Sequence, residues 1–234
     1  MFTYQNSVNA KTMEYDLGLR QFFLNVYNYM TVALAISGVV SLGISMSPTL
    51  NALIWGTPFK WVAMFLPLGL SLLFMGMMDK ISPYMAKVFL FVFAAAMGLS
   101  LSSIFLVFKL GSIVQVFFIT AATFGATSLY GYTTKRDLSK MGSFLMMGVI
   151  GLVIAGVVNV FMQSSTLTLI ISCISVLVFT GLTAFDTQNL KTIYFETDGD
   201  EREKAGVIGA FNLYINFINI FVSLLQLIGE KKDS

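Results

Sequence analysis

The chain has 234 residues, of which 56% are hydrophobic and only 11% are charged. An ordinary soluble domain carries about 25% charged residues, so 14 basic and 12 acidic side chains are too few to cover a soluble protein of this size. The net charge of +2 offers no basic field that could hold a phosphate backbone, which excludes a nucleic-acid partner. The composition predicts an all-α, multi-pass membrane protein whose main partner is the lipid bilayer.

Residues that are absent narrow the chemistry further. The sequence has no histidine and a single cysteine, Cys173, so it offers no histidine-ligated zinc site and no histidine general base. Cys173 lies in an apolar run, where we expect a small buried side chain. No phosphate-binding or dinucleotide-binding glycine motif is present. We therefore expect no enzyme and no resident cofactor.

Residues 1–21 are polar and charged, and we expect a short cytoplasmic segment there, amphipathic or disordered. Seven apolar stretches of about 20 residues follow, each long enough to cross the hydrocarbon core as a helix. They define a transmembrane domain over 22–229, followed by a short tail at 230–234. The predicted spans are 22–46, 61–78, 85–108, 112–133, 141–163, 167–190 and 206–228.

Lysine and arginine are distributed unevenly over the two sides of this predicted bundle. Ten of the fourteen fall on the side that also holds the amino terminus, which predicts a cytoplasmic amino terminus and an external carboxyl terminus. The pair Lys231 and Lys232 at the far end argues for an alternative, a re-entrant or short last segment.

Asp186 stands apart from the other acidic residues. Eleven of the twelve fall in tails, loops or span ends, whereas Asp186 lies inside the sixth predicted span, in GLTAFDTQNLK. An ionisable group within a span is costly and marks a functional site by default. Because only this one carboxylate qualifies, an intramembrane aspartyl protease, which needs two facing carboxylates, is excluded.

Polar residues of the last two spans are predicted to gather around Asp186. Spans six and seven are antiparallel neighbours, so residues equally far from their connection lie at similar depth. Such a cluster could hold the bundle together by hydrogen bonds or form an oxygen-lined path for hard cations. It would contain Thr183, Asp186, Thr187, Asn212, Asn216 and Asn219.

Several segments in the right order resemble the Bax inhibitor-1 family, in its bacterial inner-membrane branch. The similarity covers nearly the whole chain, from EYDLGLRQFFLNVYNYM through SLYGYTTKRDLSKMGSFLMMGVIGLVIAGVVN and GLTAFDTQNLK to AFNLYINFINIFVSLLQLIG. The resemblance implies a seven-helix bundle in which the other six helices surround the last.

The resemblance also implies a channel-like or leak-like function, with pH-sensitive movement of calcium across the inner membrane. Some members use two aspartates, on the sixth and seventh helices, as a proton-responsive latch. Asp186 matches the first, which makes it a candidate transient calcium contact, but the second position is Asn216 here. Many members also carry an arginine in the second helix, where this chain reads LLFMGMMDKIS.

Other bacterial relatives imply a second function. They resemble regulators of membrane protein quality control, which bind a membrane-anchored ATP-dependent protease without catalysing a reaction themselves. Both readings stay open at the level of the sequence, since exposed spans and a short charged tail could also bind a protein partner.

Overall fold

A computed structural model describes residues 2–78 and 80–232, with side chains from Leu17 onward. Helices dominate this part of the chain, and its only β pairing is an isolated antiparallel bridge between Phe108 and Lys231. The helices are α1 (Phe2–Met46), α2 (Pro48–Trp55), α3 (Phe59–Met77), α4 (Pro83–Leu101), α5 (Ile104–Val107), α6 (Leu110–Thr133), α7 (Ser139–Met162), α8 (Ser165–Glu196) and α9 (Gly199–Ile228).

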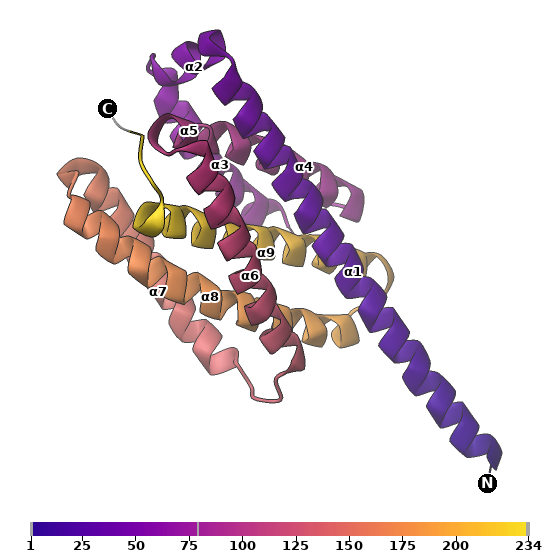
Figure 1. Cartoon of the computed structure of the whole chain (residues 1–234). Helices are drawn as coiled ribbons and strands as arrows, with labels where there is room; N and C mark the ends of the chain where they lie inside the picture. Colours follow the sequence, from indigo (N-terminus) through magenta and orange to yellow (C-terminus); the bar gives the residue numbers. More distant parts are fainter. Residues whose placement is uncertain (1, 79, 233–234) are drawn as a thin grey trace.

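Seven of these stretches are long and apolar enough to cross a membrane, as the sequence predicts. The all-α, multi-pass membrane fold is thereby confirmed (Figure 1). The spans are Leu17–Met46, Phe59–Met77, Pro83–Val107, Leu110–Thr133, Ser139–Met162, Ser165–Glu196 and Gly199–Ile228.

Serine and proline set several of the helix starts. Ser82 precedes Pro83, and its hydroxyl accepts a hydrogen bond from the backbone N–H of Met85 at 3.3 Å. Ser47 caps α2 in the same way, ahead of Pro48. A proline suits the first helical turn because the N–H that it lacks would have no partner inside the helix. Both prolines thus begin helices, between the predicted spans at 22–46, 61–78 and 85–108.

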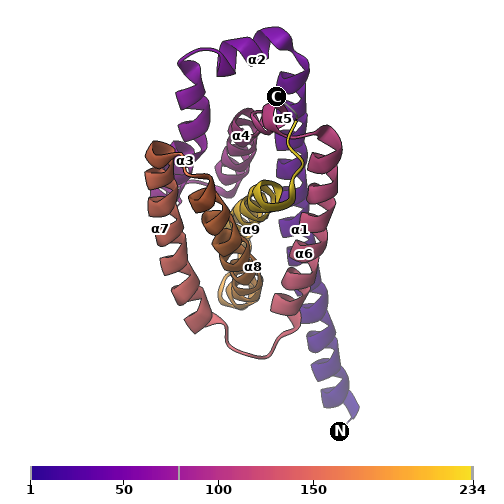
Figure 2. The same cartoon turned by 60° about the vertical axis from the view of Figure 1, so that its left-hand side comes forward.

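Helix α9 carries most of the core. It packs along α1, α4, α6 and α8, and its buried Phe211 meets Phe74 of α3 and Phe93 of α4 at ring centroid distances of 4.6 and 4.8 Å. Figure 2 looks nearly along α9, with α1 and α6 on one side of it and α3 and α7 on the other. Because α7 packs chiefly on α8, and α3 chiefly on α4, a last helix surrounded by all six others stays a prediction.

Three local expectations need correction or refinement. Helix α1 begins at Phe2 and runs on without a break, so the boundary that we placed between residues 21 and 22 falls inside it. Residues 191–205, which lie between the sixth and seventh predicted spans, are mostly helical, since only Thr197 and Asp198 separate α8 from α9. Cys173 is exposed on the outside of the bundle rather than buried, which in a membrane is a lipid-facing position.

The last span is one continuous helix, which removes the re-entrant alternative. Its 30 residues extend about 45 Å at 1.5 Å per residue, enough to cross the hydrocarbon core. The tail beyond it is fixed to the opposite end of the bundle from the α8–α9 connection. The backbone N–H of Lys109 donates to the carbonyl of Glu230 at 2.9 Å, and that of Lys232 donates to the carbonyl of Val107 at 2.9 Å.

Candidate functional site

The last two helices form an antiparallel hairpin that places Asp186 opposite Asn216. The hairpin closes through Thr197 and Asp198, and Asp198 receives both the backbone N–H and the guanidinium of Arg202. Asp186 lies 11 residues before Thr197 and Asn216 lies 18 residues after Asp198, so the two residues are not equally far from the turn. The structure nevertheless brings together these two residues, which occupy the two positions that the resemblance matches to a pair of aspartates.

Asp186 and Asn216 are joined by a short hydrogen bond between the helices. The Nδ2 amide of Asn216 donates to Oδ2 of Asp186 at 2.6 Å. Asn216 is only 4% exposed, so the bond lies within the bundle rather than at its rim. A hydrogen bond to a charged group contributes roughly 1.5–3 kcal/mol, which makes this contact a significant tie between α8 and α9.

A small cavity of about 150 Å³ opens beside Asp186, between α8 and α9. It has room for a few water molecules at roughly 30 Å³ each. Its lining includes Asp186, Asn189 and Asn212, whose side chains supply carboxylate and amide oxygens. Asp186 is the only titratable side chain among the described residues that line it.

Gly209 lets the two helices approach closely at this cavity. A Cβ atom added at Gly209 would lie 2.2 Å from Cδ2 of Leu190, closer than any real contact. The absence of a side chain there keeps α8 and α9 together around the polar lining.

Among the described residues, Asn216 is the only predicted member of the cluster that makes a side-chain hydrogen bond to Asp186. Asn219 donates to the carbonyl of Ile215 in its own helix at 2.8 Å, and Thr183 donates to the carbonyl of Phe179 at 2.8 Å. Asn212 lines the same cavity as Asp186, although its side chain is exposed. The predicted six-residue cluster is therefore brought together only in part, as Asp186 with Asn216 and Asn212.

Thr187 faces a different helix from its neighbour Asp186. Successive residues of an α-helix point about 100° apart, so Thr187 meets α6 while Asp186 meets α9. The Thr187 hydroxyl lies 3.0 Å from that of Ser128, which in turn pairs with the hydroxyl of Tyr27 on α1. A chain of hydroxyls thus links α8, α6 and α1.

Two features of the site were not predicted from the sequence, Asn189 and the contact between Tyr27 and Ser128. Asn189 lies three residues after Asp186, a spacing that puts both on one helix face and could have been recognised. Tyr27 and Ser128 are 101 residues apart, and nothing in either segment indicates that they meet.

The donor set does not form a closed metal site. In the part of the chain that the structure describes, no three histidine, cysteine, aspartate or glutamate side chains gather closely enough to hold an ion. Calcium takes six to eight oxygen ligands, so an ion at Asp186 would keep most of its water.

The comparisons with known proteins agree on one family. The family model described as inhibitor of apoptosis-promoting Bax1 matches residues 19–233. An uncharacterised protein of Rickettsia prowazekii is 42% identical over 234 residues, covering 99% of each chain. Inner membrane protein YbhL of Escherichia coli K12 is 37% identical over 219 residues, covering 92% of this chain and 94% of its own. The match across seven spans, including the hairpin that carries Asp186, shows that the chain belongs to the Bax inhibitor-1 family.

Proposed function

We propose that this protein is a channel-like or leak-like protein that lets cations, calcium among them, cross the membrane in a pH-sensitive manner. The observation that carries the proposal is the hydrogen bond between Asp186 and Asn216 beside a mostly apolar cavity, to which Asp186, Asn189 and Asn212 add carboxylate and amide groups. Burying a single carboxylate inside a bundle of apolar helices costs free energy, so its presence there marks a functional site by default.

The chemistry of the cavity favours a hard cation. Carboxylate and amide oxygens are the ligands that calcium prefers, and Asp186, Asn189 and Asn212 offer both kinds. The negative charge of Asp186 attracts a cation, and protonation removes that charge. Flux along this route should therefore depend on pH through one group.

The charges at the two ends of the bundle favour one orientation of the protein in the membrane. Ten of the fourteen lysine and arginine residues lie at the end that holds the α8–α9 connection, which favours a cytoplasmic location for that end and for the amino terminus. The similarity to an inner membrane protein of Escherichia coli supports the inner membrane as the location.

Reconstitution of the purified protein in liposomes tests the proposal. We expect release of calcium from liposomes that contain only this protein, at a rate that changes with pH, and little release from protein-free liposomes. Comparing calcium, sodium and potassium under the same gradient would identify the permeant ions. No flux of any of the three at any pH would overturn the proposal.

The alternative function is regulation of a membrane-anchored ATP-dependent protease. Only Gly142 and Leu145 are buried in α7, so the face of this helix that is turned away from α8 could contact a partner within the membrane. Absence of flux together with binding of such a protease would favour this alternative. The same preparation of protein serves both assays, which makes the two outcomes directly comparable.

A further inference from the structure

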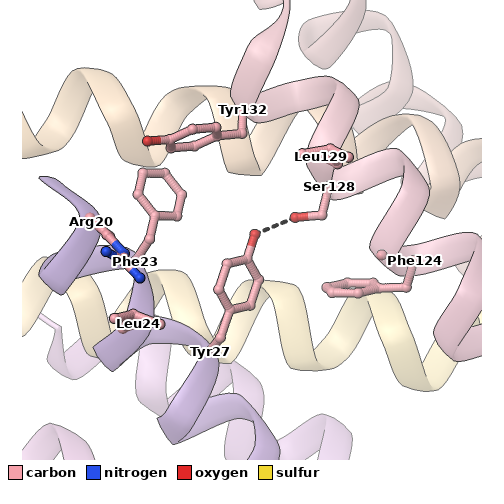
Figure 3. Close-up of a pocket in the computed structure, with 9 residues that line it drawn as sticks. Arg20, Phe23, Leu24, Tyr27, Phe124, Ser128, Leu129 and Tyr132 are labelled. Atoms are coloured by element: carbon pink, nitrogen blue, oxygen red, sulfur yellow. Dashed lines mark hydrogen bonds between the residues drawn. The ribbon is translucent and has the colours of Figure 1, made fainter. Parts of the chain in front are cut away.

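A second and larger cavity lies between α1 and α6, away from the cavity beside Asp186. Its volume is about 470 Å³, within the range of roughly 300–1,000 Å³ that is typical of ligand sites. Its walls are mostly aromatic and aliphatic, as Figure 3 shows. The lining residues are Arg20, Phe23, Leu24, Tyr27, Phe124, Gly125, Ser128, Leu129 and Tyr132.

Two of the polar groups inside this cavity are paired with each other. The hydroxyls of Tyr27 and Ser128 meet across it and bond to each other (Figure 3), and Ser128 also contacts Thr187. The body of the cavity therefore suits a hydrocarbon rather than a polar molecule.

Positive charge is concentrated at one end of the cavity. Arg20 lies there with Phe23 and Tyr132 (Figure 3). Lys191 does not line the cavity itself, but its amine lies 5.5 Å from the centre of the Tyr132 ring, which does. Tyr132 is one residue from the end of α6, the depth at which tyrosine is enriched at membrane surfaces. This end of the bundle is also the one that carries most of the lysine and arginine residues.

The cavity has an apolar rim within the candidate membrane spans, so we expect it to open to the bilayer. Leu24 and Leu129, on its rim, are 46% and 63% exposed, and both lie within membrane spans. An occupant would therefore enter sideways from the lipid.

We propose that this cavity binds one anionic phospholipid of the leaflet on the Arg20 side. An acyl chain would lie against Phe23, Leu24 and Phe124, and the phosphate would lie between the cations of Arg20 and Lys191. Basic pockets between spans near the cytoplasmic surface are known to hold anionic headgroups, and each nearby cation contributes about 1 kcal/mol. The site is separate from the proposed cation path and does not depend on it.

Retention of lipid by the intact protein, measured by native mass spectrometry, tests this proposal. The protein is exchanged into detergent with equal amounts of phosphatidylglycerol and phosphatidylcholine. We expect one bound phosphatidylglycerol and little phosphatidylcholine. Replacing Arg20 and Lys191 by glutamine should weaken binding about five-fold for each cation removed, the factor that corresponds to about 1 kcal/mol. Lys135→Gln with Lys140→Gln, at the same end but outside the cavity, is the matched control.

A second variant fills the cavity without changing charge. A Cβ atom added at Gly125 meets nothing within 4 Å, so Gly125→Leu should occupy the space and abolish retention. Gly151→Leu, at an equally open position on α7, is the control that should keep the lipid. Equal retention of the two lipids, or unchanged retention in Gly125→Leu, would overturn the proposal. A disulfide between two copies of Leu129→Cys that persists with excess phosphatidylglycerol would also overturn it, since a second copy would then cover the cavity.

Discussion

At the scale of single residues, the pairing of Asp186 with Asn216 was predictable from the sequence, and the rest of the cluster was not. An equal count from the turn does not give this pair, because Asn216 lies farther from it than Asp186 does; the match of both positions to the two-aspartate latch is what indicated the pairing. Helix rotation then decides which side chains point at each other. Asn219 and Thr183 bond to their own helices instead, because a hydroxyl or amide can satisfy itself on a carbonyl one turn earlier.

The neutral partner should make the pH response of the wild-type protein shallow. The amide of Asn216 donates to the Asp186 carboxylate, and after protonation it can turn and accept from the acid, so the pair can persist in both states. Asn216→Asp would create two close carboxylates whose titrations are coupled, because both cannot easily be charged at once. We expect a steeper dependence of calcium flux on pH in this variant. The same steepness and midpoint in both proteins would mean that gating does not pass through this pair.

At the scale of helices, the seven spans follow from apolar length alone, whereas their packing depends on contacts that the sequence does not reveal. Gly131 of α6 shows this. A Cβ atom added there would lie 2.3 Å from the backbone carbonyl oxygen of Ala184 on α8. The two helix backbones therefore touch at this point, and Gly131 is the residue that permits it.

Substitution of Gly131 should separate α6 from α8. We expect Gly131→Ala to lower the free energy of unfolding by roughly 1–3 kcal/mol, the usual cost of overpacking, because the atom in the way belongs to the backbone and cannot rotate aside. Thermal unfolding in detergent would measure the loss. Gly125→Ala on the same helix has open space around it and should unfold at or slightly above the wild-type temperature. Equal effects of the two substitutions would show that α6 and α8 do not meet at Gly131.

At the scale of the whole molecule, contacts between distant segments agree with the predicted arrangement of the two ends. Lys87 at the start of α4 pairs with Glu203 at the start of α9, and Lys109 before α6 pairs with Glu230 after α9. Odd numbers of spans put the two termini on opposite sides. The charge pattern alone assigns those sides to compartments, because the packing of the helices is the same in either orientation.

Labelling of single cysteines should locate the two ends. In a Cys173→Ala background, cysteine at Lys135, between α6 and α7, should react only with reagents that reach the cytoplasm. Cysteine at Lys231, beyond α9, should react from outside. Both positions are exposed, so accessibility in the protein itself does not limit the reaction. Reaction of both from one side would rule out seven complete spans.

The most direct test of the proposed cation path compares calcium flux across a range of pH values in wild-type protein and in Asp186→Asn. The substitution keeps the size and hydrogen-bonding ability of the side chain but removes its charge and its titration. Asp200→Asn, at an exposed position in the first turn of α9, makes the same change away from the cavity and serves as the control. We predict that Asp186→Asn gives a flux that no longer varies with pH, while the control follows the wild-type curve. A pH–flux curve unchanged in Asp186→Asn would contradict the assignment of Asp186 as the titrating group of the path.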